Sequence, residues 1–331
     1  MNALDGGEMG DFFKGKNVLV AGGTGFVGTA FVQAVLDAGA NVTTTVHRRK
    51  PIVTDPRLKT VEADLGDREQ ARAAMKDQEI VFHCAGAVSA AGVTASNPME
   101  PITDNLKLTA MVLEAAWKTG VERIQVFGSS TAYPVTEHPV REEEMWSAEP
   151  HPSYFGYGWM RRYIERMAEF VHERSKTKVV LVRPTATYGR HDDFHPVTSH
   201  VIPALIRKAV ERMDPYEVWG TGDEVRDFLH VDDLARGCLL ATEKYATCQP
   251  INIGYGKTST VREIVEAILR AADYSDAKLV FNSDRPTTIP KRMVDISKAR
   301  EILGFEPQRT LEEGLADTVR WYAETRRREA A

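Results

Sequence analysis

Cysteine is scarce in this chain of 331 residues. The three cysteines, Cys84, Cys238 and Cys248, are an odd number and form no C-x-x-C pair. A disulfide framework needs paired cysteines, and a structural zinc site needs closely spaced thiolates or imidazoles. The sequence therefore indicates neither kind of cross-link, and we expect reduced thiols that are mostly buried.

Long apolar runs and an excess of positive charge are also missing. No run approaches the ~18 apolar residues of a membrane helix, and the N-terminal segment MNALDGGEMGDFFKGK lacks the apolar core of a signal peptide. With 42 Lys and Arg against 47 Asp and Glu, the net charge is −5, so no general basic surface for nucleic acid or an anionic membrane is expected. We expect a cytoplasmic globular protein without nucleic-acid or membrane partners.

Short β-branched segments alternate with longer helical patterns in the first half of the chain. This alternation is typical of parallel strands that are covered on both faces. We therefore predict an α/β fold with a Rossmann-type doubly wound parallel sheet over residues 1–184. The predicted strands are Asn17–Ala21, Asn41–Val46, Thr60–Glu62, Ile80–His83, Arg123–Phe127 and Val179–Arg183, and the most regular helical patterns are Asn105–Thr119 and Tyr157–Lys176.

The pattern beyond Pro184 is less regular, and we expect residues 185–331 to form a smaller α/β lobe. The segments predicted there are helices at His200–Arg212, Val261–Ala271 and Leu311–Glu324, strands near Glu217–Trp219 and at Ile251–Ile253, and a strand–helix step over Phe228–Leu240. Because no linker or clear boundary separates the two halves, the lobe is expected to interleave with the sheet.

A glycine-rich turn, Gly22-Gly23-Thr24-Gly25-Phe26-Val27-Gly28, follows the strand VLVA and opens a helical run. Gly22, Gly25 and Gly28 permit a tight turn, close approach of the backbone to a pyrophosphate and close packing of helix on strand, and the helix N-terminus offers N–H donors. A glycine triplet alone is weak evidence, but a dinucleotide site requires this strand–turn–helix context. The alternative is a turn of purely structural use.

The residues after the second predicted strand bear on the choice between NAD and NADP. A carboxylate there would take the ribose 2′-hydroxyl of NAD, whereas an arginine takes the 2′-phosphate of NADP. The stretch reads Val46-His47-Arg48-Arg49-Lys50 and contains no carboxylate. This favours NADP, held by His47, Arg48 and Arg49; a solvated basic turn beside NAD is the alternative. Other predicted cofactor contacts are Asp64, Leu65, Ala85, Gly86, Ala87, Asn105 and Pro184.

Two further segments carry a catalytic pattern. Gly128-Ser129-Ser130-Thr131-Ala132-Tyr133-Pro134 follows the strand RIQVF, and the second segment reads Tyr157-Gly158-Trp159-Met160-Arg161. With the glycine turn, they resemble the extended short-chain dehydrogenase/reductases, which have Ser or Thr at the end of the fifth strand and Tyr-x-x-x-Lys on the next helix. The resemblance implies that Tyr157 protonates the sugar oxygen as hydride arrives, with Ser129 as its hydrogen-bonding partner.

Arg161 occupies the position of the family's lysine. A phenol is a weak acid, and a fixed cation beside it favours its anionic form. Arginine keeps this charge and can donate two hydrogen bonds to the ribose diol of the cofactor, but it is bulkier than lysine and cannot titrate. An active enzyme is therefore expected, and a binding protein without activity is the rival interpretation.

Four segments of the second half look like those of the GDP-L-fucose synthases within this family: Tyr188–Phe194, Ser199–Ile206, Val218–Gly222 and Arg226–Leu234. The resemblance implies a GDP-linked 4-keto-6-deoxy sugar as substrate, with Lys208, Trp219, Arg226 and Arg292 as contacts to the GDP moiety. It also implies that His200 exchanges a proton beside the ketone. The second exchanging group of that branch is a cysteine, and here its catalytic position holds Thr131, whose hydroxyl is far too weak an acid to supply the anion.

The sequence thus predicts an NADP(H)-dependent reductase of carbon 4 in a GDP-linked 4-keto sugar, with impaired epimerisation. The alternatives are an epimerase or dehydratase that keeps NAD tightly bound, and a non-catalytic NADP(H)-binding protein. The cluster His191–His195 is accounted for by the resemblance, so no metal is expected. In similar proteins the helices that correspond to Asn105–Thr119 and Tyr157–Lys176 form a dimer contact, which implies a homodimer.

Overall fold

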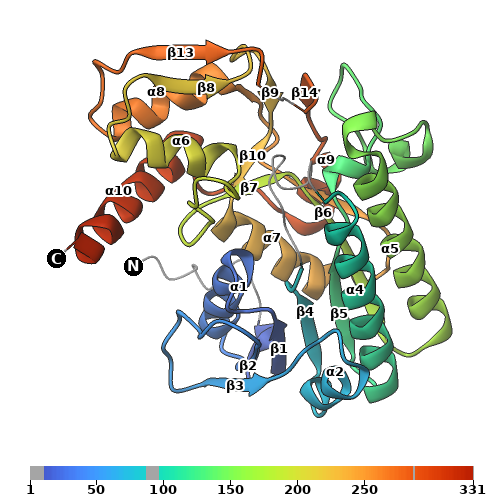
Figure 1. The fold of residues 1–331 in the computed structure, drawn as a ribbon. Helices are drawn as coiled ribbons and strands as arrows, with labels where there is room; N and C mark the ends of the chain where they lie inside the picture. Colours follow the sequence, from blue (N-terminus) through green and yellow to red (C-terminus); the bar gives the residue numbers. More distant parts are fainter. Residues whose placement is uncertain (1–10, 87–96, 286–287, 331) are drawn as a thin grey trace.

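A parallel sheet of seven strands runs through the molecule, in the order β11-β6-β5-β4-β1-β2-β3 (Figure 1). The computed structural model describes residues 11–86, 97–285 and 288–330, so the predicted cofactor contact Ala87 lies outside the described residues. The strands are β1 (Asn17–Ala21), β2 (Asn41–Val46), β3 (Leu58–Glu62), β4 (Ile80–His83), β5 (Arg123–Phe127), β6 (Lys178–Pro184) and β11 (Ile251–Ile253). All neighbours pair in parallel, which confirms the predicted fold class.

Helices cover both faces of this sheet, because its central strands are apolar on both sides. One face carries α1 (Phe26–Asp37), α7 (Val231–Lys244) and α9 (Ser297–Leu303), and the other carries α2 (Arg68–Met75), α4 (Glu100–Thr119) and α5 (Phe155–Arg174). Each face has its own core of buried aliphatic and aromatic side chains. The sheet is therefore the middle layer of three.

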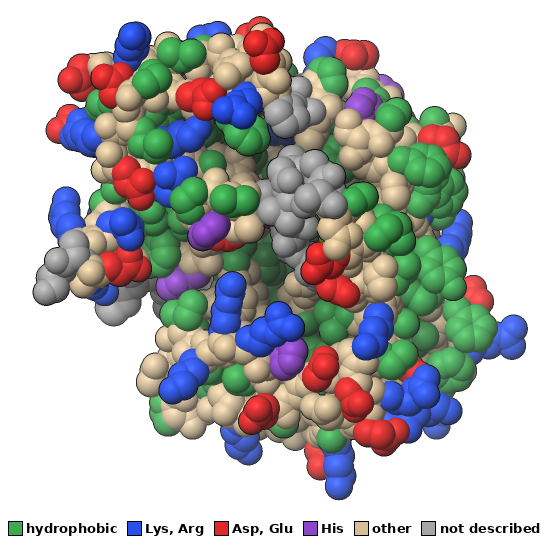
Figure 2. Space-filling view, viewed as in Figure 1, with side chains coloured by type: hydrophobic (Ala, Val, Ile, Leu, Met, Phe, Trp, Pro, Cys, Tyr) green, Lys and Arg blue, Asp and Glu red, His purple; other side chains and the backbone are tan. Residues whose placement is uncertain are grey.

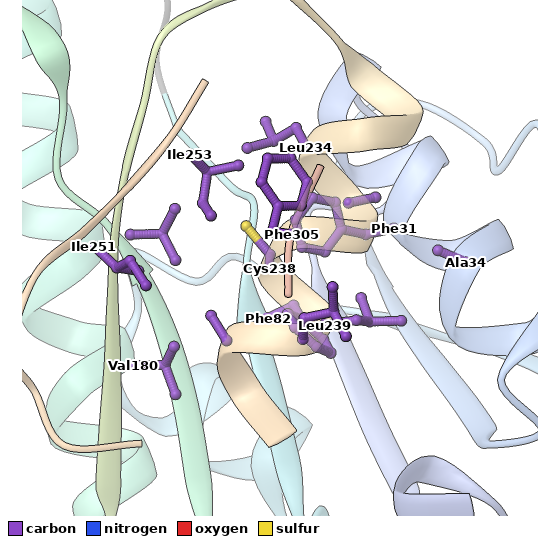
Figure 3. Close-up of a cluster of buried hydrophobic side chains, with 14 of the residues drawn as sticks. Phe31, Ala34, Phe82, Val180, Leu234, Cys238, Leu239, Ile251, Ile253 and Phe305 are labelled. Carbon is purple, nitrogen blue, oxygen red and sulfur yellow. The ribbon is translucent and has the colours of Figure 1, made fainter. Parts of the chain in front are cut away.

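The second half of the chain supplies part of this core. Figure 3 shows Leu234, Cys238 and Leu239 of α7 among side chains of α1 and of the sheet, including Phe31 and Phe82. The strand predicted at Ile251–Ile253 forms the edge of the main sheet, with Ile251 opposite Val182 of β6. The sheet is thus completed by residues that lie far beyond Pro184.

The remaining elements form a lobe around a third core. Its helices are α6 (Val201–Val210), α8 (Val261–Ala271) and α10 (Leu311–Ala330). Its short strands pair as β8 (Tyr216–Trp219) with β13 (Leu279–Asn282), β10 (Phe228–His230) with β7 (Ala186–Tyr188), and β9 (Val225–Arg226) with both β12 (Ser259–Thr260) and β14 (Lys291–Arg292). Single turns of 3-10 helix lie at η1 (Asp11–Phe13), η2 (Ser130–Ala132), η3 (Glu142–Trp146) and η4 (Pro152–Tyr154).

The largest differences from the predicted bounds are at the end of α10, which continues to Ala330 rather than ending at Glu324, and at the start of α4, which begins at Glu100 rather than Asn105. Pro101 lies in its first turn, where the missing N–H of proline costs no hydrogen bond. In the part of the chain that the structure describes, no helix has the length and apolar character needed to cross a membrane.

Candidate active site

The glycine turn and the Ala85-Gly86 pair lie at the carboxyl ends of β1 and β4. These neighbouring strands mark the point where the order of the sheet changes direction, which is where ligands bind in folds of this type. Gly22 has φ +83, and a Cβ there would lie 2.6 Å from Cα of Ala85. A Cβ on Gly28 would lie 2.1 Å from the carbonyl oxygen of Gly22, so neither position accepts a side chain.

The N-terminus of α1 points its first N–H groups into this turn without a capping side chain. Its N-cap is Gly25, and Thr24, Phe26 and Val27 complete the turn around it. Uncapped N–H groups at a helix N-terminus bind phosphate. The residues present therefore fit the pyrophosphate of a dinucleotide.

The basic turn after β2 is exposed. His47, Arg48 and Arg49 all present their side chains to solvent directly after Val46. Figure 2 shows Lys and Arg side chains along the lower border of a hollow in this face of the molecule. The turn is thus free to meet a phosphate, and its role in cofactor choice stays a prediction.

Two other predicted cofactor residues, Asp64 and Asn105, have hydrogen-bond partners of their own. The carboxylate of Asp64 accepts a hydrogen bond of 2.8 Å from the N–H of Gly66, and Asn105 is buried and donates to the carbonyl of Pro101 at 2.6 Å. Leu65 is buried in the core below α2. Pro184 ends β6, beside the carboxyl end of β5.

Tyr157 and Arg161 lie one turn apart on α5 and are in direct contact. Nη2 of Arg161 donates to the phenol oxygen of Tyr157 at 2.5 Å, and Nη1 lies 3.4 Å from the carbonyl oxygen of Phe127 at the end of β5. Nε of Arg161 is buried and has no hydrogen-bond partner among the described residues. A buried donor without a partner is costly, and this one fits the predicted contact with the cofactor ribose.

Ser129 pairs with Thr131 in the turn after β5. The two hydroxyl oxygens are 2.8 Å apart, and Ser129 Oγ also accepts from the N–H of Thr131 at 3.1 Å. The residue in the position of the family's cysteine is therefore a hydrogen-bonding partner of the predicted catalytic serine.

His83 belongs to this site but was not among the predicted residues. It ends β4, is 5% exposed, and its Nε2 lies 3.1 Å from Oγ1 of Thr109 on α4. Burial and the nearby charge of Arg161 lower the pKa of His83 to about 3. Its place at the end of the strand, directly before Cys84-Ala85-Gly86, was the available signal.

His200 occupies the N-cap position of α6, and its exposed imidazole makes no capping hydrogen bond. The helix begins through its backbone instead, because the carbonyl of His200 accepts from the N–H of Ala204 at 3.0 Å. The imidazole is thus not used by the helix start.

Two of the predicted GDP contacts lie on the β8 side of the lobe. Nζ of Lys208 donates to the carbonyl of Glu217 at 2.6 Å, and burial lowers the pKa of this lysine. Trp219, 43% exposed, has the guanidinium of Arg285 5.3 Å from its ring centre. Arg285 was not predicted, since nothing in the sequence pairs it with Trp219.

The other two predicted contacts, Arg226 and Arg292, meet around Tyr154. Arg226 is engaged by the chain itself, since its guanidinium donates to Thr288 Oγ1 and to three backbone carbonyls. Burial and the charge of Arg292 lower the pKa of Arg226 to about 10. Arg292 stacks on the ring of Tyr154 at 4.5 Å and keeps two buried N–H groups, Nε and Nη2, without partners among the described residues.

Arg292 and Tyr154 also line a narrow pocket together with Thr131 and His151. Burial would raise the pKa of Tyr154, but the charges of Arg292 and Arg226 bring it below its ordinary value. The pocket lies between the turn after β5 and these two arginines. The positive charge there favours an anionic group beside Tyr154.

Named relatives are similar over almost the whole chain. A probable GDP-L-fucose synthase 1 from Oryza sativa subsp. japonica is 31% identical over 94% of this chain and 93% of its own length. A dTDP-4-dehydro-6-deoxy-D-allose reductase from a Streptomyces species is 29% identical over 94% of this chain and 98% of its own length. A solved structure, UDP-glucose 4-epimerase from Thermotoga maritima, superimposes with a TM-score of 0.83 at 28% identity, covering 93% of this chain and 99% of that one.

The family comparison agrees with the fold, the glycine turn and the predicted kind of enzyme. The sequence model of one family matches residues 18–254, from β1 through β11. This span includes the glycine turn, the Ser129–Thr131 pair and the Tyr157–Arg161 contact. The chain belongs to the NAD dependent epimerase/dehydratase family.

Proposed function

We propose that this protein reduces the carbon-4 ketone of a GDP-linked 4-keto-6-deoxy sugar with NADPH. The observation that carries the proposal is the 2.5 Å hydrogen bond between Arg161 and the phenol of Tyr157, beside the end of β5 where Ser129 lies. The names of the similar proteins support it, since they include GDP-L-fucose synthases and a reductase of a 4-dehydro sugar nucleotide.

In this mechanism a bound reduced nicotinamide supplies hydride to carbon 4. Tyr157 gives its phenol proton to oxygen 4, and Arg161 stabilises the phenolate that remains through its hydrogen bond. Ser129 donates a hydrogen bond to oxygen 4 and is itself oriented by Thr131. Because the guanidinium of Arg161 holds a fixed charge, it performs this role without gaining or losing a proton.

Proton exchange at the neighbouring carbons is expected to be incomplete. A carbon beside a ketone is acidic enough for a thiolate or an imidazole to deprotonate, but an alcohol such as Thr131 is not ionised near neutral pH. His200 remains as one exchanging group, with an imidazole that α6 does not use. We therefore infer a reductase in which at most one of carbons 3 and 5 exchanges its proton.

The nucleotide end of the substrate is assigned to the positive part of the lobe. Arg292, with two buried N–H groups to offer, suits the diphosphate, and the partly exposed Trp219 offers a stacking face for the guanine. Lys208 and Arg226 lie beside these two residues and complete the set. NADP is favoured by Arg48 and Arg49, and a homodimer through α4 and α5 is part of the same proposal.

One incubation tests the reaction. The purified protein, NADPH and GDP-4-keto-6-deoxymannose are mixed in heavy water, and NADPH oxidation and deuterium in the product are measured. We expect oxidation of NADPH with label at no more than one of carbons 3 and 5. Thr131→Cys should gain exchange and His200→Asn should lose whatever exchange the parent shows, while both keep reduction.

Two control variants separate the roles of the α5 residues. Tyr157→Phe should lose reduction by at least about a hundredfold, because the proton donor is gone. Arg161→Lys keeps the charge and should stay active. Label at both carbons at similar rates would show that another residue supplies the missing base. Product without net oxidation of NADPH would identify an epimerase with bound NAD, and no turnover of any 4-keto nucleotide sugar would leave a binding protein.

A further inference from the structure

The C-terminal helix α10 contacts the loop that leads into His200. Residues 189–199 connect β7 to α6, and His200 begins that helix. In Figure 1, α10 lies beside α6 on the outer side of the lobe. The loop at residues 189–199 therefore packs near a helix that is more than 100 residues later in the chain.

An ion pair joins the start of this loop to α10. Arg190 donates two hydrogen bonds to the carboxylate of Asp317, from Nε at 2.7 Å and from Nη2 at 2.8 Å. The side chain of Asp317 is 15% exposed. A two-pronged pair with a largely buried carboxylate fixes orientation better than an exposed surface pair does.

Aromatic contacts extend the junction toward His200. The ring of His191 meets Trp321 edge to face, with centroids 4.8 Å apart, and the ring of Phe194 stacks on Tyr322 at 4.3 Å with an angle of 13° between planes. Between Phe194 and His200, the carboxylate of Asp193 accepts from the N–H of His195 at 2.9 Å and from the hydroxyl of Thr198. The loop thus has hydrogen bonds within itself and ring contacts with helix α10.

The same aromatic residue of α10 also reaches the far end of α6. The hydroxyl of Tyr322 donates to Oε1 of Glu211 at 3.1 Å, and Glu211 is the C-cap residue of α6. Tyr322 therefore contacts both the loop before His200 and the end of the helix that His200 begins. One side chain of α10 thus contacts segments on both sides of α6.

We propose that α10 positions His200 for proton exchange, with Asp317 and Tyr322 as the positioning residues. The inference rests on the proposed function, in which His200 exchanges a proton beside the ketone. It adds that helix α10 determines the position of the His200 imidazole, although α10 contributes no predicted site residue. A reacting group displaced by about 1 Å can lose on the order of a hundredfold in rate, so loosening this junction should affect exchange first.

The first experiment needs no substrate. Hydrogen–deuterium exchange of the whole protein is followed by mass spectrometry in Asp317→Asn, Arg190→Gln and Phe194→Leu. Peptides that cover residues 190–200 should exchange on the order of tenfold faster than in the unmodified protein, while peptides of β1 to β4 stay unchanged. The matched control is Glu329→Gln, an exposed acid on the same helix that pairs with Arg326, which should leave the loop unchanged.

The second experiment measures catalysis in the same variants. The ratio of deuterium wash-in to carbon-4 reduction should fall on the order of tenfold in Asp317→Asn, with reduction itself within about twofold of the parent. Tyr322→Phe, which keeps the ring stack, should retain more exchange than Tyr322→Ala. The proposal would be overturned if peptides of residues 190–200 exchanged at the parent's rate in Asp317→Asn, Arg190→Gln and Phe194→Leu. It would also be overturned if these peptides exchanged faster while the ratio of wash-in to reduction stayed unchanged. Failure of the proposed function is distinct, since it appears as absent reduction by the unmodified protein.

Discussion

Arg161 acts on two side chains of the site. It donates to the phenol of Tyr157 at 2.5 Å, and its charge helps to keep the buried imidazole of His83 neutral. At neutral pH the site therefore holds one cation beside Tyr157 rather than two. Burial and the charge of Arg161 both oppose a second positive charge on His83.

The first prediction concerns the pH dependence of stability. Because the folded-state pKa of His83 lies at about 3, below its ordinary value of 6.5, the unfolded chain binds a proton in this window that the folded chain excludes. The contribution of His83 is fully present above pH 6.5 and is lost as pH falls toward 3. His83→Gln, which can keep the bond to Thr109, should lose less stability on acidification than the parent does.

Urea unfolding at several pH values measures this difference. The gap between parent and variant should shrink by up to about 1.4 kcal/mol for each pH unit below about 6. The exposed His47→Gln change serves as the control and should follow the parent. A gap that stays constant down to about pH 4 would show that His83 does not titrate in the unfolding reaction.

The second prediction concerns cofactor choice. Arg48 and Arg49 follow β2 with exposed side chains, and charge-assisted hydrogen bonds to a 2′-phosphate should favour NADPH over NADH by about ten- to a hundredfold in affinity. Replacing both arginines with serine should erase the preference, whereas Lys50→Ser should leave most of it. Equal affinities of the unmodified protein for the two cofactors, measured by calorimetry, would contradict the assignment of NADP.

At the scale of secondary-structure elements, one buried ion pair joins helix α5 to the sheet. Glu165 of α5 and Arg183 of β6 are both 2% exposed and share two hydrogen bonds of 2.8 and 2.7 Å. Arg183 also donates to the hydroxyl of Tyr133, which in turn donates to Asn252 of β11. The chain of contacts links α5, β6 and β11, and Glu165 lies two turns after Tyr157 on the same face of the helix.

The third prediction follows from this pair. Glu165→Gln or Arg183→Met leaves a buried partner uncompensated, which costs about 3–5 kcal/mol. Replacing both residues, as Glu165→Leu with Arg183→Met, should cost less than the sum of the two single changes. Chemical unfolding of the three variants measures these costs, and strict additivity would mean that the two groups do not depend on each other.

The sequence was most informative where a strand or helix carried a clear apolar pattern. The strands β1, β2, β4, β5 and β11 and helix α8 match their predicted bounds. All residues of β4 and β11 are buried, and α8 buries its apolar residues at helical spacing. The strands β7, β9, β12 and β14 have only two or three residues and show no period to detect. The position of β11 beside β6 depends on contacts between distant segments, which no local pattern reveals.

The sequence predicted which residues belong to the candidate site better than it predicted their hydrogen-bonding partners. Tyr157 and Arg161 are brought together as their spacing of four on a helix requires. The pairing of Ser129 with Thr131, and the engagement of Arg226 by Thr288 and its neighbouring carbonyls, depend on side-chain geometry. His83 could be recognised only once its burial beside Arg161 was known.

At the scale of the whole molecule, the outer face of α5 is unusually apolar. Phe155, Trp159, Tyr163 and Phe170 are 54%, 37%, 58% and 55% exposed and recur at helical spacing on one side. Figure 2 shows hydrophobic side chains gathered over this helix on the right of the view. Exposed apolar patches of this kind are typical of protein interfaces, and two such faces suit each other in a symmetric pair.

The fourth prediction is therefore a homodimer at micromolar concentration, observed by sedimentation velocity. Tyr163→Glu together with Phe170→Glu should yield a monomer, because each dimer buries both positions twice and charges there would lack partners. Val197→Glu, at another exposed apolar position, should leave the dimer intact. A monomeric parent protein would refute the assignment of this face.

The place of β11 at the edge of the sheet has a consequence for how the chain is made. On a ribosome, β6 emerges long before β11 does, so its outer row of N–H and C=O groups stays open while β7 to α7 are synthesised. Open strand edges pair readily with other chains and lead to aggregation. Helix α7, which covers the same face of the sheet as α1, is also synthesised late. A nascent chain that stops short of residue 253 thus has a first half with an unpaired strand edge at β6 and an exposed apolar face where α7 would pack.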